Sequence, residues 1–299
     1  MDATGRQFEI AHGSLRAWVT EVGAGLRRLA RGDVEILDAQ GPDEMPAAGR
    51  GQLLIPWPNR VADGRYRWDG EDQQLPITEV PTGCAIHGLT RWTAWYRVEE
   101  RPEAVILALA VHPQPGYPFR LDLRAEHRVG PDGYSVTVEA VNAGDRACPY
   151  ACGAHPYLRL GAARADDLEV HLDAGTVLTV DDRGIPTGTA PVSGDTDFRS
   201  PRRVGAAVLD TAFADLARDA EGRAWVHVRA PGGAAASLWL DEAHSHVMLF
   251  TGDPQPTVAR RSLGVEPMTA PPNAFASGDG LRRLAPGERA RASWGIRPA

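Results

Sequence analysis

Apolar and polar residues alternate with a period of two along most of the chain, which is the pattern of strands that bury one face. Turn residues break this alternation at short intervals. The clearest cases are segments 65–68 and 73–75 around Asp69-Gly70, and segments 120–129 and 134–141 around Pro131-Asp132-Gly133. Because short turns that contain Asp-Gly join neighbouring antiparallel strands, these two patterns predict β-hairpins.

The same alternation predicts further strands, and helical periodicity appears only in short pieces such as 211–218. The predicted strands are 7–11, 15–19, 92–98, 104–111, 176–180, 225–228, 237–240, 246–251 and 289–296. The 32 glycines and 24 prolines are spread along the chain, and neither a linker nor a repeat is visible. The sequence therefore predicts one all-β domain over residues 1–299, a large antiparallel assembly with little helix.

Composition and charge narrow the class of partner. The chain has 299 residues, of which 43% are hydrophobic and 24% charged, as in a globular domain with a sizeable core. The net charge is −7 and no basic run occurs, which argues against a nucleic acid or an anionic membrane as partner. The longest apolar run, 104–111, is too short to cross a membrane. A small molecule is the predicted partner.

All basic residues are arginine, so a Schiff base, a lysine general base and a Walker-type phosphate lysine are excluded. The three cysteines, Cys84, Cys148 and Cys152, form no Cys-x-x-Cys motif, which fits a reducing compartment. The first 13 residues contain charges and no stretch of signal-peptide type. These features predict a cytoplasmic protein.

One polar cluster follows two prolines. Pro56 and Pro58 stiffen the backbone just before Asn59 and Arg60, and Trp57 between them offers an apolar face. Preset donors beside an aromatic ring suit a polyhydroxylated ligand. A surface loop in which Arg60 pairs with a carboxylate explains the same residues equally well, and the alternatives remain open at this point.

Three further residues have side chains suited to proton transfer. His87 lies between a short apolar pair and a glycine, while His155 and Glu266 each precede a proline, which favours an extended backbone. Glu266 ends an apolar stretch, where partial burial raises the pKa of a carboxyl toward that of a usable general base. Each residue alone also fits a structural role, since single histidines in proteins are mostly hydrogen-bonded structural residues.

Taken together and in order, these motifs resemble those of the aldose 1-epimerase (galactose mutarotase) family, and the resemblance covers essentially the whole chain. The motifs are Asn59-Arg60 with Ala62-Asp63-Gly64-Arg65-Tyr66, Ile86-His87-Gly88 with Arg91-Trp92, His155-Pro156-Tyr157, and Gly264-Val265-Glu266-Pro267-Met268 with Pro272-Asn273-Ala274-Phe275. The resemblance implies a large, strongly curved β-sandwich (supersandwich), an open sugar cleft, and no metal or cofactor.

The resemblance also implies roles for individual residues. It places the general acid at His155 and the general base at Glu266, which predicts a bell-shaped pH profile whose acidic limb comes from Glu266 and whose basic limb comes from His155. The implied ligands of the sugar hydroxyls are Arg60, His87 and Asp210, with Asp215 close enough in sequence to leave that last position open.

The sequence departs from well-known members of the family in Pro-Trp-Pro before Asn59, in a single glycine after His87, and in Pro267-Met268 after Glu266. These differences affect the substrate more than the reaction. A hexose-6-phosphate or a sulfonated sugar therefore remains an alternative, with Arg91, Arg159 and Arg164 as candidate ligands of the anion.

Other readings rank lower. A metal site would need a third ligand beside His244 and His246, which on alternate strand positions more often mark an exposed edge. A glycoside hydrolase needs a second carboxylate with a motif of its own. A non-catalytic sugar-binding or sensing protein on the same scaffold could lack the acid or the base, and both are present here. The oligomeric state, monomer or homodimer, is left open by the sequence.

Overall fold

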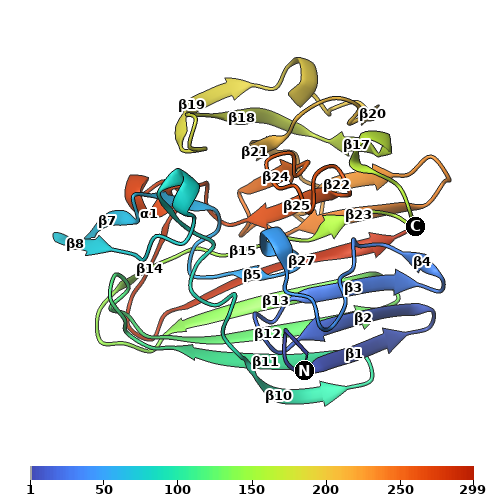
Figure 1. The fold of residues 1–299 in the computed structure, drawn as a ribbon. Coiled ribbons are helices and arrows are strands. Elements are labelled where there is room, and N and C mark those ends of the chain that lie inside the picture. The colour runs from blue at the N-terminus through green and yellow to red at the C-terminus, as the bar shows by residue number, and fades with distance from the viewer. Residues whose placement is uncertain (1) are drawn as a thin grey trace.

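The structure, a computed structural model, describes residues 2–299, and its regular secondary structure is almost entirely antiparallel strand (Figure 1). The only α-helix among these residues is α1 (Ala274–Ser277), and the 3-10 turns are η1 (Ala47–Gly49), η2 (Val80–Thr82), η3 (Ala165–Asp167) and η4 (Gly194–Thr196). The predicted all-β class with little helix is confirmed.

The largest sheet has nine strands, in the order β10-β11-β12-β13-β27-β23-β22-β17-β20. Their bounds are β10 (Tyr96–Arg101), β11 (Ala104–Val111), β12 (Leu121–Gly130), β13 (Gly133–Asn142), β27 (Arg289–Pro298), β23 (Ala235–Leu240), β22 (Ala224–Arg229), β17 (Glu169–Leu172) and β20 (Arg202–Arg203). The C-terminal strand β27 thus lies in the middle of this sheet, between β13 and β23.

A second sheet of eight strands carries part of the candidate site. Its main path is β19-β18-β21-β24-β25-β15-β5, and β16 pairs with β25 beside that path. The strands are β19 (Pro186–Pro191), β18 (Ala174–Val180), β21 (Asp210–Leu216), β24 (His246–Phe250), β25 (Leu263–Met268), β15 (Gly153–Ala154), β5 (Leu53–Leu54) and β16 (Tyr157–Leu158).

Smaller sheets complete the fold. The N-terminal sheet β1-β2-β3-β4 packs against β11 and β12 of the large sheet (Figure 1). Its strands are β1 (Gln7–His12), β2 (Leu15–Thr20), β3 (Leu26–Arg31) and β4 (Val34–Glu35). The two-stranded ribbons are β6 (Arg60–Ala62) with β9 (Cys84–Ile86), β7 (Arg65–Trp68) with β8 (Glu71–Gln74), and β14 (Cys148–Tyr150) with β26 (Arg282–Leu284).

Alternation of side chains builds the core. Along β12, Leu121, Leu123 and Ala125 are buried, while Asp122 and Arg124 between them are exposed. One continuous hydrophobic cluster includes residues from β1 through to β27. No helix among residues 2–299 has both the length and the apolar character needed to span a bilayer.

Both predicted hairpins are confirmed, as β7–β8 and as β12–β13. The helical interpretation of 211–218 is wrong, because residues 210–216 form β21, which pairs with β18 and β24 on its two sides. Pairing on both edges and burial of Ala212 and Phe213 outweigh the weak local helical pattern. The strand predicted at 92–98 begins only at Tyr96.

Candidate active site

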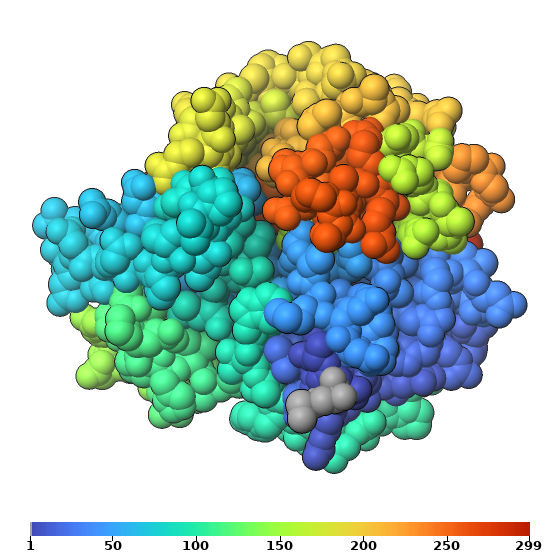
Figure 2. Space-filling model, viewed as in Figure 1, coloured from blue at the N-terminus to red at the C-terminus, as the bar shows by residue number. Residues whose placement is uncertain are grey.

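A cavity of about 240 Å³ lies over the eight-stranded sheet. Its lining residues come from five separate regions of the chain and are Pro46, Ala48, Gly49, Asn59, Arg60, Thr78, Glu79, Ile86, His87, Arg91, Trp92, His155, Asp210, Met248, Phe250, Gln255 and Glu266. In the space-filling view, orange atoms from the region near residue 255 face teal atoms from the region near residue 85 (Figure 2).

Strand register brings His155 and Glu266 together across 111 residues of sequence. Gly153 pairs with Met268 and Tyr157 pairs with Gly264, so the antiparallel register places residue 155 opposite residue 266. At this point the backbone of His155 turns to the other side, where its N–H donates to Gln52 and its carbonyl accepts from Gly51. The imidazole is therefore fixed beside the Glu266 carboxyl.

The two side chains form a buried acid–base pair. His155 Nε2 lies 3.3 Å from Glu266 Oε1, and both side chains are almost fully buried. Burial, followed by the charges of Arg91 and Arg50, lowers the pKa of His155 to about 3. Burial, followed by the charge of Asp210, raises the pKa of Glu266 well above its usual range, although Arg60 opposes this shift. These directions favour a neutral pair with a single proton.

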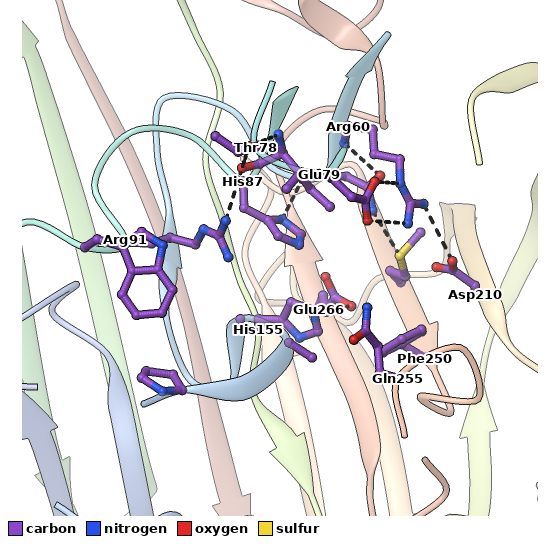
Figure 3. Close-up of a pocket in the computed structure, with 17 residues that line it drawn as sticks. Arg60, Thr78, Glu79, His87, Arg91, His155, Asp210, Phe250, Gln255 and Glu266 are labelled. Carbon is purple, nitrogen blue, oxygen red and sulfur yellow. Dashed lines mark hydrogen bonds and ion pairs between the residues drawn. The ribbon is translucent and has the colours of Figure 1, made fainter. Parts of the chain in front are cut away.

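Arg60 is held by carboxylates on two sides (Figure 3). Its Nε and Nη2 donate to Glu79 at 2.6 and 3.0 Å, and its Nη1 lies 3.6 Å from Asp210 Oδ2. Burial alone would lower the pKa of Arg60, but the hydrogen bond to Glu79 and the charge of Asp210 raise it on balance. Burial raises the pKa of Asp210, against the charge of Arg60. The guanidinium is thus charged and fixed in direction.

Backbone conformation sets His87 and Asn59. Both residues adopt positive φ, 63° and 53° respectively, and each hydrogen-bonds to the other. The Asn59 N–H donates to His87 Nδ1 at 3.1 Å, and the His87 N–H donates to the Asn59 carbonyl at 2.9 Å. Because Nδ1 accepts, the proton of the neutral imidazole resides on Nε2. Burial, then the charge of Arg91, keeps the pKa of His87 well below its usual range. His87 thus enters the site as a hydrogen-bond donor.

The glycine after His87 is required by the same geometry. Gly88 has φ 74°, and a Cβ on it would collide with the backbone of Ile55. Only a residue without a side chain fits there. The Ile-His-Gly segment therefore has a steric explanation that does not involve the ligand.

Glu79, Gly49 and Gln255 line the cavity and were not assigned a role from the sequence, whereas Arg91 was named there as a candidate ligand of an anion. Glu79 anchors Arg60, Gly49 lies against the His155 ring, Gln255 extends toward the cavity from the segment between β24 and β25, and Arg91 lines the wall near His87 (Figure 3). No sequence motif marks Gln255 or Gly49. Glu79 lies five residues before Cys84, the first residue of β9, and β9 pairs with β6, which begins at Arg60. A prediction of this β6–β9 ribbon would have placed Glu79 near Arg60.

The predicted site residues do not all reach the cavity. Asn59, Arg60, His87, His155, Asp210 and Glu266 line it. Trp57 does not, because it is buried in the core and packs on Phe275 at a ring separation of 5.2 Å. Asp215 hydrogen-bonds to Thr176 on the exposed side of the sheet, which leaves Asp210 as the aspartate at the site.

Other candidates also lie elsewhere. His244 is buried, not on an exposed edge as expected, and hydrogen-bonds to Asp241, whereas His246 hydrogen-bonds to Ser245. Within residues 2–299 no group of three His, Cys, Asp or Glu side chains is arranged to hold a metal ion. Arg159 pairs with Asp38, so of the three arginines considered for an anion only Arg91 lines the cavity.

The fold is an antiparallel β-sandwich with a polar cavity, and His155 and Glu266 approach each other at the floor of this cavity. The sequence model of the aldose 1-epimerase family matches residues 6–297. The chain belongs to the aldose 1-epimerase family, whose members are isomerases, and the resemblance inferred from the motifs is confirmed.

Similar proteins agree with this membership. An uncharacterized Escherichia coli protein, YihR, is 35% identical over 99% of this chain and 94% of its own length. Human galactose mutarotase is 29% identical over 51% of this chain and 46% of its own length. Among solved structures, a GalM/aldose epimerase homologue from Caenorhabditis elegans has a TM-score of 0.87 at 18% identity and covers 98% of each chain. Galactose 1-epimerase from Lactobacillus acidophilus has a TM-score of 0.82 at 21% identity, over 97% of this chain and 92% of its own.

Proposed function

We propose that this protein is a mutarotase that interconverts the α and β anomers of an aldohexose or a related sugar by acid–base ring opening. The observation that carries the proposal is the 3.3 Å approach of His155 and Glu266 at the floor of the cavity, with the donors of Arg60 and His87 above it. Two titratable groups whose pKa values are pushed apart are typical of an acid–base pair.

The reaction needs one base and one acid. The base removes the proton of the C1 hydroxyl, the bond between C1 and the ring oxygen breaks, and the acid protonates that oxygen. The open aldehyde turns about its C1–C2 bond and closes on the other face. Since His155 and Glu266 together hold one proton, the proton accepted by one group is balanced by the proton lost from the other, and reclosure restores the pair. Proton transfer alone completes the cycle, so the proposal includes no metal or cofactor.

The ligand set suits a hydroxylated ring. Arg60 and Asp210 offer charged donor and acceptor atoms, and His87 offers Nε2–H. Charge-assisted hydrogen bonds of this kind orient a sugar within reach of the pair.

The three cysteines of the described chain are free, which supports the proposed cytoplasmic location.

The test is the rate of mutarotation of freshly dissolved pure anomers, followed by polarimetry with the uncatalysed rate subtracted. Glu266→Gln and His155→Asn keep similar shapes but cannot complete the proton transfers, so each lowers turnover by ~10²–10⁴-fold. Glu221→Gln, an exposed change of the same chemistry, serves as the control and keeps full turnover. Near-native turnover in a folded Glu266→Gln protein refutes the proposed function.

One observation favours a second candidate, the same reaction on a sugar with an anionic substituent. Arg91 is largely buried, and within residues 2–299 no carboxylate lies within salt-bridge distance of it. Its Nε has no hydrogen-bond partner and its Nη2 reaches only the Ile86 carbonyl, at 3.4 Å. Burial lowers the pKa of Arg91 to about 10, against the charge of Glu79, so the group remains a cation at neutral pH. A phosphate, sulfonate or carboxylate would satisfy this cation.

A comparison of neutral and anionic anomers separates the two candidates. If Arg91 binds an anion, Arg91→Gln raises the KM for a 6-phosphorylated or 6-sulfonated aldose about tenfold or more and leaves the KM for the neutral aldose unchanged. Arg159→Gln is the control, because Arg159 pairs with Asp38 outside the lining. Equal effects of Arg91→Gln on neutral and anionic sugars would leave the neutral aldose as the proposed substrate.

A further inference from the structure

The second ring nitrogen of His155 has no hydrogen-bond partner among the described residues. Catalytic histidines are usually oriented by a hydrogen bond to the nitrogen that does not face the substrate. In His155 that nitrogen, Nδ1, is buried and makes no hydrogen bond within residues 2–299. Packing must therefore orient this ring.

Two neighbours enclose the His155 ring. Tyr157 stacks on it with ring centroids 4.8 Å apart and an angle of 8° between the planes. Gly49 covers the ring edge so closely that a Cβ there would lie 2.9 Å from His155 Cδ2. The orientation of the imidazole thus depends on the position of the Tyr157 ring.

Tyr157 is itself fixed by the segment that contains Gly49. Its hydroxyl donates to the Ala48 carbonyl at 3.1 Å, and the Arg50 guanidinium carbon lies 5.7 Å from its ring centroid, within the range of a cation–π contact. Arg50 is 7% exposed and lies 3.3 Å from Asp38. Burial of a charged guanidinium costs desolvation free energy, and support of a tyrosine ring does not by itself require a charge. The charge of Arg50 therefore calls for a separate explanation.

Asp38 is the carboxylate that three arginine side chains share. Its carboxylate is fully buried and lies within 3.4 Å of Arg50, Arg159 and Arg261, and Ser262 donates to it at 3.1 Å. Three guanidinium groups therefore share the negative charge of Asp38, and the charge of Glu44 also acts on Arg50. Arg50 is buried beside Tyr157, while Arg159 and Arg261 extend toward solvent.

We propose that Arg50, anchored by Asp38 and acting through Tyr157, is a positioning residue that fixes the orientation of the His155 ring and disfavours its protonated form. The proposal rests on the proposed function only for the role of His155 in catalysis, because the stack and the charge of Arg50 exist without any substrate.

Several charged or titratable groups face His155, and Arg50 is one contributor. Glu266 faces Nε2, His87 lies edge-on at a ring separation of 5.3 Å, and Arg91 and Arg50 add positive charge. The two centroid distances put the Arg50 guanidinium carbon no more than about 10.5 Å from the imidazole. With an effective dielectric constant of about 20, one charge at that distance changes a pKa by about one unit.

The test is an NMR titration of the labelled His155 ring, with the His155→Asn variant to assign its signal. Arg50→Gln is expected to raise the pKa of His155 by about one unit and to move the acidic limb of kcat by the same amount. Arg50→Lys keeps the charge and restores both values. Arg261→Gln is the matched control, since it removes another guanidinium from Asp38, and Arg261 is not among the charges that lower the pKa of His155, so we expect a smaller shift.

An unchanged His155 pKa in Arg50→Gln, or equal shifts in Arg50→Gln and Arg261→Gln, overturns the proposal. Because the NMR titration needs no turnover, it decides the proposal even if the protein is not a mutarotase. If Arg50→Gln does not fold, Tyr157→Leu and Tyr157→Phe provide the second test. Loss of the ring in Tyr157→Leu is expected to lower kcat at least tenfold with KM within about twofold, while Tyr157→Phe keeps kcat within about threefold. Equal kcat values for these two variants also overturn it.

Discussion

The proton count of the His155–Glu266 pair determines the pH range in which the site can work. Burial, then Arg91 and Arg50, lowers the pKa of His155 to about 3, and burial, then Asp210, raises that of Glu266 well above 4.5. Between these values the pair holds one proton, on Glu266. The charged form with imidazolium and carboxylate also holds one proton, so in the proposed reaction ring opening converts the neutral form of the pair into the charged form.

The sign of each limb follows from these shifts. As the pH falls through about 3, His155 takes up a second proton and the pair loses its base. As the pH rises through the raised pKa of Glu266, the pair loses its proton and with it the acid. These shifts predict the reverse of the order that the family resemblance implies, in which Glu266 gives the acidic limb and His155 the basic limb. The physical cause of this predicted reversal is the burial of both groups in one low-dielectric site.

The predicted change in the protonated fraction of His155 is large enough to measure directly. At pH 5 an ordinary histidine is about 97% protonated, whereas a His155 with a pKa near 3 is about 1% protonated. Moving the proton from Glu266 to His155 is uphill, because burial lowers the pKa of His155 and raises that of Glu266.

The assay combines a pH profile of kcat/KM on a pure anomer with NMR of the labelled His155 ring in the same buffers. Circular dichroism on each sample separates loss of activity from unfolding. We expect a neutral His155 at pH 5 and an acidic limb that follows its titration. A His155 ring that titrates near 6.5 in the folded protein would refute the reasoning, and the limb assignment implied by the family resemblance would return.

Three further predictions concern the surroundings of the pair. Glu79→Gln removes the negative charge that holds Arg60 through two hydrogen bonds, so we expect the KM for the sugar to rise about tenfold and kcat to change less. Initial-rate kinetics measure both values, with Asp63→Asn as an exposed control. Gly49→Ala places a Cβ against His155 at a φ of 73°, so we expect kcat to fall at least tenfold and stability to fall by about 1–3 kcal/mol. In the control Gly32→Ala, φ is also positive but no atom lies near the new Cβ, so only the stability measured by thermal unfolding should fall. Dialysis against a chelator should leave the rate unchanged, since proton transfer needs no Lewis acid, and restoration of a lost rate by a divalent ion would contradict this.

Local sequence pattern predicted the strands whose partners are adjacent in the chain. The hairpins around Asp69-Gly70 and Pro131-Asp132-Gly133 pair consecutive strands, and each carries its own alternation and turn signal. Some strands with distant partners were missed or misjudged, although 289–296 was predicted and forms β27 between β13 and β23. The strand β25 is buried at all six positions and so shows no alternation, and β21 is a strand because β18 and β24 pair with both of its edges.

The candidate site shows the same division between local and distant information. His155, Glu266, Arg60 and Asn59 could be found because each belongs to a short motif with a distinctive local sequence. Trp57 belongs to such a motif too, yet its ring packs into the core, because sequence adjacency does not fix the side of the backbone on which a side chain lies. Glu79, Gly49 and Gln255 were missed because only the folded chain brings them to the cavity.

The two cavity arginines divide the ligand site into unequal parts. Arg60 is matched by Glu79 and Asp210, so the region around it carries no excess positive charge and can exchange hydrogen bonds with neutral hydroxyls. Arg91 lies on the wall near His87 without such a partner in the described chain, which makes its region the electropositive end of the cavity. The neutral His155–Glu266 pair adds no net charge between them. A sugar bound with its ring over the pair would therefore direct its hydroxyls to Arg60 and Asp210, and the substituent that reaches Arg91 would decide which sugar the protein prefers.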